Sequence, residues 1–367
     1  MARVRCAVVG ATGVAGQQFL IALDRHPQFE VVKLAASERS AGKRFTDAIR
    51  EPSGRTQWYC KEPLPEEFAR LTVENAAAMT TDGIDLVFTA IESDAARELE
   101  PRFAARVPVI STASAYRYEE DVPIFLPGVN LGAEGTADHV GLIEVQRQRR
   151  GWRGFITPGP NCTTTGMAIT LKPLADAFGL EKVMMTSLQS LSGAGRSPGV
   201  AALEIVDNVI PYIAKEEEKV ERETQKILGT LVGDQIQPAP ISVSCTCTRV
   251  NVLEGHTEAV FASFARRGTV AEAAEVLRNF GAGFSALKLH SAPERLIEVL
   301  DDPYRPQPRL DRDAGGGMTT VVGRLREETT LGVWGVKYVL VSHNTRMGAA
   351  RGGVLVAEYL LHQGTIK

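Results

Sequence analysis

The fold class of this chain follows from one stretch near its start, Val4-Arg5-Cys6-Ala7-Val8-Val9-Gly10-Ala11-Thr12-Gly13-Val14-Ala15-Gly16. The first six residues form a run of strand length that is apolar except for Arg5, and a GxxGxxG turn follows directly. A strand, a glycine turn and a helix in this order bring backbone N–H groups and the positive end of a helix to a pyrophosphate. The stretch therefore predicts a dinucleotide site whose binding residues are Gly10, Thr12, Gly13, Val14 and Ala15.

Helical and strand-like segments alternate after this turn. Residues 13–26 and 93–105 have helical character, and residues 30–36, 84–90 and 107–111 are short apolar strands. Such alternation is typical of parallel strands that are joined by crossover helices. We therefore expect an α/β Rossmann domain in this part of the chain.

The pattern changes near residue 150. Long β-rich segments follow at 182–190, 241–252 and 256–264, with expected helices at 199–213 and 215–228 and a closing helix at 348–362. A chain of 367 residues is long for one hydrophobic core. We predict a Rossmann domain at 1–150 with 343–367, and a mixed α+β catalytic and dimerisation domain at 151–342.

The turn after the second strand points to the kind of dinucleotide. Glu38 is the one acceptor there for a ribose 2′-hydroxyl, which favours NAD. Four neighbours offer donors or positive charge for a 2′-phosphate instead. Because donors outnumber the acceptor, we predict NADP as the cofactor, bound by Ser37, Arg39 and Ser40 with Lys43 nearby.

A second informative stretch delivers one cysteine to the start of a helix. Residues 158–166 read Pro-Gly-Pro-Asn-Cys-Thr-Thr-Thr-Gly, and the apolar residues after them recur at helical spacing. At a helix N-terminus, unpaired N–H groups and the helix dipole favour thiolate over thiol, so Cys162 is a candidate nucleophile. The alternative is a small buried cysteine before a helix.

Composition excludes several classes of function. The net charge is −3 with mixed signs, which gives no electrostatic reason to expect nucleic acid or a membrane surface as a partner. Five cysteines without a CxxC pair suit a reducing compartment, and we expect a cytoplasmic protein. Cys245 and Cys247 lie two apart on an expected strand, where strand packing is favoured over metal ligation, so no metal site is predicted.

Five ordered motifs together resemble the aspartate-β-semialdehyde dehydrogenases, from about Val4 to Glu358. The amino-acid sequences of several segments are similar to those of the archaeal and fungal branch of this family. The motifs are Asn161-Cys162-Thr163-Thr164, Gln189 with residues 192–195, Arg249 with His256, residues 216–219 ahead of Glu223-Thr224, and residues 111–117.

The resemblance implies a two-domain fold like that of glyceraldehyde-3-phosphate dehydrogenase and a function in making amino acids of the aspartate family (lysine, threonine, methionine and isoleucine). In that family the cysteine attacks aspartyl phosphate and forms a thioester, which NADPH reduces to the semialdehyde. The implied catalytic residues are Cys162, His256 as acid/base, and Gln189 as the group that orients the acyl intermediate. The implied substrate residues include Asn161. Arg117 and Lys219 would bind the phosphate, Glu216 the amino group and Arg249 the carboxylate. Ser192, Gly193 and Asn344 would flank the nicotinamide, and a homodimer or homotetramer is expected.

Four positions carry residues that differ from those usual in the family, namely Thr112, Gly128, Gly159 and Arg351. These positions belong to the expected wall of the active site and to the cofactor pocket. A substrate other than that of the family therefore stays an alternative. One alternative is a malonyl-CoA reductase, against which Glu216 argues, since malonyl has no amino group. A more distant alternative is an N-acetyl-glutamyl-phosphate reductase, and another class altogether is a non-catalytic, NADP-sensing binding protein.

Overall fold

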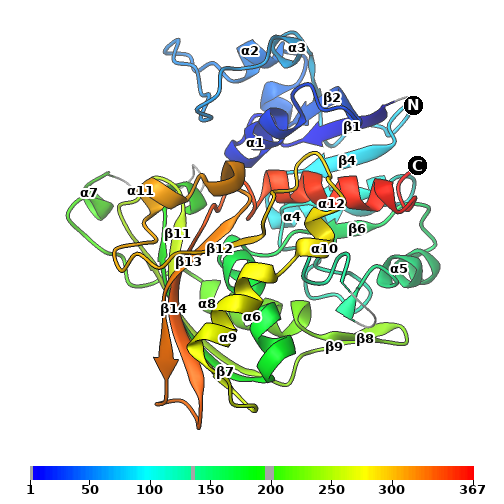
Figure 1. The fold of residues 1–367 in the computed structure, drawn as a ribbon. Helices are drawn as coiled ribbons and strands as arrows, with labels where there is room; N and C mark the ends of the chain where they lie inside the picture. Colours follow the sequence, from blue (N-terminus) through cyan, green and yellow to red (C-terminus); the bar gives the residue numbers. More distant parts are fainter. Residues whose placement is uncertain (1–2, 134–136, 195–201) are drawn as a thin grey trace. The chain divides into compact units, whose positions relative to one another are not determined.

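The computed structural model describes residues 3–133, 137–194 and 202–367 (Figure 1). The chain divides into two compact units. The first comprises Met1–Pro123, Gly141–Gly159 and Gly353–Lys367, and the second comprises Ile124–Val140 and Pro160–Gly352. Compared with the expected domains, the main boundary lies nine residues later. The second unit also extends to Gly352 and includes an earlier segment, 124–140.

The first unit contains a six-stranded parallel sheet in the order β3-β2-β1-β4-β5-β6. The strands are β1 (Val4–Val9), β2 (Phe29–Ala36), β3 (Val73–Asn75), β4 (Leu86–Thr89), β5 (Val109–Ser111) and β6 (Ile156–Pro158). The helices are α1 (Val14–Leu23), α2 (Phe45–Ala48), α3 (Glu66–Ala69), α4 (Ser93–Ala104), α5 (Leu142–Arg150) and the short η1 (Glu38–Ser40). Helix α12 (Ala350–His362) belongs to this unit from Gly353 onward. The strand order reverses beside β1, so the glycine turn that follows β1 lies at the position where doubly wound sheets bind nucleotides.

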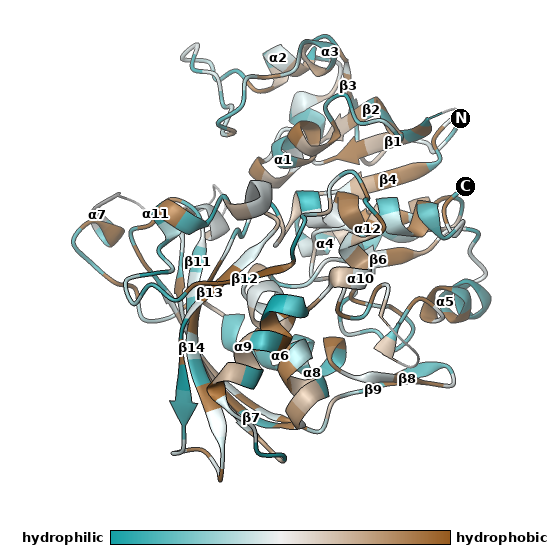
Figure 2. Cartoon of the chain, viewed as in Figure 1, coloured by the Kyte–Doolittle hydropathy of each residue, from teal (hydrophilic) through white to brown (hydrophobic). Residues whose placement is uncertain are grey.

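Buried aromatic residues and apolar strands hold this sheet. Phe19 of α1 packs against Phe88 of β4, with ring centroids 5.0 Å apart, and Phe29 meets Phe88 edge-on. Figure 2 shows β1 and β4 largely in the hydrophobic colour. Both faces of a parallel sheet are covered by helices, which explains why these strands read as continuous apolar runs rather than as alternating ones. The predicted Rossmann fold is confirmed, and the expected helix near the C-terminus is present as α12.

The second unit contains a mixed sheet in the order β10-β7-β11-β14-β13-β12. Its strands are β7 (Leu180–Gln189), β10 (Ser242–Arg249), β11 (His256–Phe264), β12 (Ile297–Val299), β13 (Thr320–Glu328) and β14 (Gly335–Ser342). A separate hairpin joins β8 (Thr230–Val232) to β9 (Gln235–Gln237). The helices are α6 (Cys162–Phe178), α7 (Ala202–Ile205), α8 (Glu216–Ile227), α9 (Val270–Asn279), α10 (Ala282–Ser285) and α11 (Pro308–Asp311), with η3 (Leu191–Ala194) and η4 (Ala314–Gly317).

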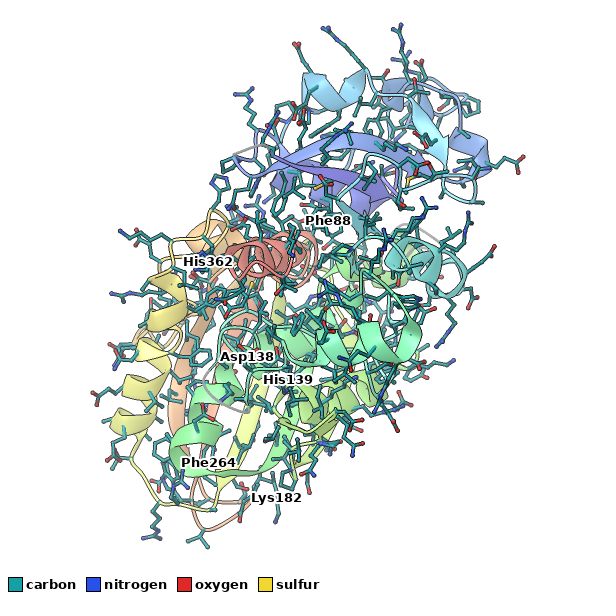
Figure 3. All side chains as sticks on the ribbon, turned by 90° about the vertical axis from the view of Figure 1, so that its right-hand side faces the viewer. Phe88, Asp138, His139, Lys182, Phe264 and His362 are labelled. Carbon is teal, nitrogen blue, oxygen red and sulfur yellow. The ribbon has the colours of Figure 1, made fainter. Side chains whose placement is uncertain are left out.

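The three long helices α6, α8 and α9 lie on one side of this sheet (Figure 1). Strand β7 therefore buries alternate residues: Val183, Met185, Ser187 and Gln189 are buried while the residues between them are exposed. Strand pairing aligns Lys182 with Ser263, and Figure 3 shows Lys182 beside Phe264 at one end of the sheet. A slip of one residue would turn the buried side chains of a strand outward, so the buried face sets the register of the strands.

Helix α6 begins at Cys162 because Asn161 caps it. The Asn161 side chain accepts hydrogen bonds from the N–H groups of Thr163 and Thr164, at 2.8 and 3.3 Å. An N-cap of this type stabilises a helix by about 1 kcal/mol. Gly179, with a φ of 74°, ends the helix after an almost entirely buried run. The sequence prediction for this helix is confirmed.

The expected helix at 199–213 is wrong for its second half. Residues 195–201 lie outside the described part of the chain, α7 ends at Ile205, and Asp207 has a left-handed φ of 58°. Ile210 then pairs with Arg249 through backbone hydrogen bonds in both directions. The backbone groups of Ile210 are therefore bonded to an extended strand, which a helix would not allow.

A buried hydrogen-bond network explains why residues 124–140 belong to the second unit. The Asn130 amide donates to Ile124 O at 2.9 Å and to Nδ1 of His139 at 3.0 Å, so Nε2 of His139 donates to Gly229 O at 3.0 Å. Burial lowers the pKa of His139 to about 4, so the ring is neutral near pH 7. Figure 3 labels this histidine beside Asp138.

Candidate active site

Four polar residues meet where three adjacent strands end under the start of α6. Arg249 ends β10, Gln189 ends β7 and His256 begins the antiparallel β11. Strand pairing places Arg249 opposite Gln189, and all three side chains are buried on the face that α6 covers. Cys162, the first residue of α6, lies with its Sγ 3.2 Å from Nε2 of His256. The predicted catalytic trio and Arg249 thus lie together.

The tautomer of neutral His256 follows from its other ring nitrogen. Nδ1 accepts a hydrogen bond from the backbone N–H of Ser190 at 3.1 Å, so the proton is on Nε2 and points to Sγ of Cys162. Burial, together with the positive charge of Arg249 and the nearby His343, lowers the pKa of His256 to about 3. A neutral imidazole that donates to sulfur and the N-terminus of α6 both favour a thiolate.

Arg249 reaches the centre of this cluster. Its Nη1 donates to the carbonyl of Ser190 at 2.7 Å, and a Cβ at Gly193 would lie 2.9 Å from the same nitrogen. Burial lowers the pKa of Arg249, and the negative charges of Cys162 and Glu216 oppose that shift. Gly193 therefore serves the close packing of Arg249 and His256, which leaves no room there for a side chain.

Glu216, the first residue of α8, is held by two amides beside the nucleophile. Its Oε1 accepts from Nδ2 of Asn161 at 2.8 Å and from Nε2 of Gln189 at 3.2 Å. The Lys219 ammonium lies 3.9 Å from Oε2 and is partly exposed. The sequence alone favoured a solvated helix face for Glu216, but its side chain is buried. A buried carboxylate next to Cys162 offers a counter-charge for a cationic substrate group.

Glu223 is a site residue that the sequence analysis did not assign a role. Its Oε2 accepts a 2.6 Å hydrogen bond from the backbone N–H of Asn161, and its side chain is fully buried. Glu223 lies seven residues after Glu216, which is two turns of the same helix. That spacing was a usable signal, since it places both carboxylates on one face. The two glutamates together fix the residue that precedes Cys162.

The glycine turn of the first unit is shaped to receive a pyrophosphate. Gly10 has a φ of 85°, and a Cβ on it would lie 2.2 Å from the carbonyl oxygen of Ala90. A Cβ on Gly16 would lie 2.1 Å from the carbonyl oxygen of Gly10. The turn is therefore as tight as a dinucleotide fingerprint requires, and Gly13 caps the N-terminus of α1. Thr12, Val14 and Ala15 lie on this turn and the first turn of α1, as predicted.

The proposed 2′-phosphate residues follow β2. Ser37 and Arg39 are exposed around the short helix η1, where they are accessible to a ligand, whereas Ser40 is buried. Arg117 also belongs to the first unit, and its Nη2 donates to the carbonyl of Thr112 at 3.2 Å. The assignment of Arg117 to a substrate phosphate remains a prediction.

The amide of Asn344 is bonded within the second unit. Its Oδ1 accepts from Gly255 N at 2.9 Å and from Oγ of Ser190 at 3.1 Å, and its Nδ2 donates to Oγ of Ser192 at 2.8 Å. Asn344 therefore holds together the segments around His256. The prediction that Asn344, Ser192 and Gly193 flank the nicotinamide is kept as a prediction.

The structure bears on three of the four positions that differ from the residues usual in the family. Gly128 has a φ of 75°, and a Cβ there would lie 2.4 Å from Cδ1 of Leu296, so a side chain would clash. Arg351 donates to the carbonyl of Gly316 at 3.4 Å. Gly159 has space for a Cβ, so nothing in its surroundings requires glycine.

Two kinds of feature are absent from residues 3–133, 137–194 and 202–367. Within these ranges no group of three or more His, Cys, Asp or Glu side chains could hold a metal ion. Cys245 and Cys247 are both buried on one face of β10, as predicted, and burial raises the pKa of Cys247 to about 12. In the same ranges no helix has the length and apolar character to cross a bilayer.

Comparison with known proteins agrees with this geometry. Residues 5–137 match the family described as semialdehyde dehydrogenase, NAD binding domain, and residues 171–347 match semialdehyde dehydrogenase, dimerisation domain. The chain is 45% identical to the aspartate-semialdehyde dehydrogenase of Archaeoglobus fulgidus, over 99% of this chain and 100% of that protein. It is 40% identical to the enzyme of that name from Saccharomyces cerevisiae, over 98% of each. The crystal structure of aspartate-semialdehyde dehydrogenase with NADP from Candida albicans superimposes with a TM-score of 0.87 at 38% identity and covers 100% of each chain.

Proposed function

Since this chain belongs to the aspartate-semialdehyde dehydrogenase family, we propose that it converts L-aspartyl-4-phosphate to L-aspartate-4-semialdehyde, with NADPH as reductant and release of phosphate. The observation that carries this function is the 3.2 Å contact between Sγ of Cys162 and Nε2 of His256 at the start of α6. A nucleophile beside an acid/base is what acyl transfer requires.

The first half of the reaction uses residues of the second unit. Sγ of Cys162 attacks the acyl carbon, and phosphate leaves with the electron pair of its C–O bond, so that a thioester remains. His256 exchanges a proton with the sulfur through Nε2. Splitting the reduction into acyl transfer and a second step lowers each barrier.

NADPH, when bound, supplies the hydride that converts the thioester to the aldehyde oxidation level. The residues that would hold it are those of the glycine turn, whose close backbone approach at Gly10 fits a pyrophosphate, and Ser37 and Arg39 after β2. The chain itself keeps the acyl group and the sulfur in place while this happens. Gln189, fixed by its hydrogen bond to Glu216, is proposed to orient the acyl group.

Recognition of the substrate rests on three charged side chains. Glu216 is proposed to bind the α-amino group, Arg249 the α-carboxylate and Lys219 the phosphate, because these charges are complementary. This also separates the proposal from a malonyl-CoA reductase, whose substrate would offer no amino group to the buried carboxylate of Glu216.

The proposed assembly is a homodimer formed through the exposed face of the mixed sheet. Met184 and Leu188 of β7 are 51% and 40% exposed on the side opposite to α6. Pairing places Met184 beside Phe261 and Ser244, and Leu188 beside Thr257 and Thr248. An exposed sheet face that carries large apolar residues is suited to association with a second copy. The match of residues 171–347 to a dimerisation domain supports this proposal.

One assay tests the function directly. We expect the purified protein to reduce NADP⁺ with aspartate semialdehyde only when inorganic phosphate is present, measured by absorbance of the reduced nicotinamide. Parallel reactions contain NAD⁺, or malonyl-CoA with NADPH. Turnover with malonyl-CoA and none with aspartate semialdehyde would contradict the proposed substrate.

A pair of variants tests whether Glu216 and Lys219 of α8 bind different groups of the substrate. Glu216→Gln is expected to raise the KM for aspartate semialdehyde by about ten- to a hundredfold, because loss of a hydrogen bond to a charged group typically costs about 1.5–3 kcal/mol. Lys219→Ala is expected to raise mainly the KM for phosphate. Steady-state kinetics with both substrates varied give the two profiles. Indistinguishable profiles would refute separate roles for these residues.

A further inference from the structure

Strand β10 is the outermost strand at one edge of the mixed sheet, and helix α8 packs against it. The N–H of Cys245 donates to Oε1 of Glu221 at 3.0 Å. The N–H of Cys247 donates to Oε1 of Glu217 at 2.9 Å. An edge strand would otherwise present such N–H groups without a backbone partner. The two carboxylates of α8 take the place of that partner, and these two hydrogen bonds are called the edge contacts below.

The spacing of the two glutamates fits the spacing of the two strand residues. Glu217 and Glu221 are four residues apart, which is a rise of about 6 Å along a helix. Cys245 and Cys247 are two residues apart, which is about 6.6 Å along a strand. The later glutamate meets the earlier cysteine, so α8 runs antiparallel to β10. Because both contacts must be made together, they fix the register of the helix on the strand.

The same edge is bonded to the chain on both sides of the edge contacts. Ahead of α8, the N–H of Ile210 donates to the carbonyl of Arg249 at 3.0 Å, and the N–H of Arg249 donates back at 2.8 Å. Four residues after Glu221, Nε2 of Gln225 donates to the carbonyl of Ile241 at 2.9 Å. The segment from 210 to 225 thus follows the edge of the sheet without a change of register.

A different face of α8 meets the active site. At about 100° per residue, Glu216 and Glu223 lie about a third of a turn around the helix from Glu217 and Glu221. Glu216 accepts from the side chain of Asn161 at 2.8 Å, and Glu223 accepts from its backbone N–H at 2.6 Å. A slide of α8 along β10, or a rotation of the helix, would carry Glu216 out of this position. The edge contacts oppose both movements.

We propose that Glu217 and Glu221 are positioning residues, which set the register of α8 on β10 and thereby hold Glu216 where the α-amino group of the substrate binds. This inference rests on the proposed function, in which Glu216 and Arg249 bind the amino and carboxylate groups. Glu216 begins α8 and Arg249 ends β10. The separation of these two binding groups is therefore set by the way in which the helix lies on the strand.

The first test is Glu217→Ala, which removes the acceptor of the Cys247 N–H. We expect the KM for aspartate semialdehyde to rise by about tenfold, because a displacement of about 1 Å that originates away from the reacting atoms can cost up to about a hundredfold. We expect little change in kcat, since the amino group is bound equally in the ground state and the transition state. Steady-state kinetics at saturating phosphate measure both constants.

A double-mutant cycle with Glu216→Gln separates positioning from a general effect on the fold. In the Glu216→Gln background we expect Glu217→Ala to change this KM by less than about twofold, because no carboxylate remains there to be misplaced. A loosened fold would weaken binding in both backgrounds alike. Glu217→Gln keeps an oxygen acceptor for the Cys247 N–H, and it is expected to restore most of the affinity.

Hydrogen exchange measures the edge contact itself. In Glu217→Ala the N–H of Cys247 is expected to exchange at least about tenfold faster, followed by mass spectrometry of fragments from residues 242–249. The matched control is Glu218→Ala, which removes an exposed glutamate and hence the same charge from the same first turn of α8. Exchange at Cys247 and both kinetic constants are expected to be unchanged in the control.

Three outcomes would overturn the inference. The first is an equal rise in KM on Glu217→Ala in both backgrounds of the cycle. The second is an unchanged KM in a Glu217→Ala variant whose Cys247 N–H exchanges faster, and the third is unchanged exchange at Cys247. If Glu217→Ala does not fold, Glu221→Ala enters the same cycle and exchange is measured at Cys245. Absence of semialdehyde turnover in the unmodified protein would refute the proposed function instead, and the exchange measurement would still test the edge contacts.

Discussion

Replacement of Cys162 by alanine is expected to abolish phosphate-dependent oxidation of aspartate semialdehyde, with a loss in kcat of at least about 10⁴-fold, as is usual when a nucleophile is removed. The reason is that no thioester can form without Sγ, and His256 then has no sulfur with which to exchange a proton through Nε2. Binding of NADP, followed by nicotinamide fluorescence or calorimetry, is expected to change by less than about twofold because Gly10 and its neighbours belong to a different unit.

The control for this variant is a second cysteine of the same unit. Cys245→Ala removes a buried thiol from β10, where burial raises the pKa of Cys245, and full phosphate-dependent turnover is expected to remain. Substantial turnover by Cys162→Ala would show that sulfur at this position is not the nucleophile. Equal losses in the two variants would point to a structural effect of cysteine removal.

Much of the site was predictable because its residues lie at the ends of regular elements. The turn before Cys162 carries its own capping residue, Asn161, and the strand patterns that end at Gln189 and begin at His256 are plain in the sequence. Adjacent strands bring such ends together whatever the detailed packing. The family resemblance then supplied roles for these residues that the periodicity alone could not give.

The remaining contacts were not predictable because their partners are far apart in the sequence. Ser190 meets His256 across 66 residues, and Glu223 meets Asn161 across 62. A serine after a strand and a glutamate in a charged helix look like ordinary solvated residues until the fold places them. The helix expected at 199–213 failed for a similar reason, because pairing of Ile210 with Arg249 overrides local helical preference.

Glu258 is a second position whose character only the fold reveals. It lies two residues after His256 on β11, between Ser187 and Leu340 of the neighbouring strands, and its side chain is fully buried. A Cβ on Gly166 of α6 would lie 3.2 Å from its Oε1, so the helix packs closely over the carboxyl group. Neither carboxyl oxygen has a hydrogen-bond partner among the side chains that the structure describes. Burial therefore raises the pKa of Glu258 well above its usual value.

This burial makes the stability of the protein depend on pH in a defined direction. Above about pH 4.5 the unfolded chain releases the Glu258 proton, whereas the folded chain keeps it. The free energy of unfolding contributed by this group consequently falls by about 1.4 kcal/mol for each pH unit, until the pH reaches the pKa in the folded state. Stability is thus lost as the pH rises, opposite to the behaviour of a paired surface carboxylate.

Glu258→Gln is expected to remove this dependence, because an amide of the same shape does not titrate. As the pH rises from 5, the variant is expected to gain stability relative to the unmodified protein by about 1.4 kcal/mol for each pH unit, until the pH reaches the pKa of Glu258 in the folded protein. Urea unfolding at a single protein concentration, repeated at each pH, measures the difference. Glu298→Gln, which changes an exposed glutamate on β12, is the control and should give a pH-independent difference. A constant difference for Glu258→Gln over the same range would mean that Glu258 is ionised in the folded protein, and that its carboxylate is stabilised inside the sheet in spite of its burial.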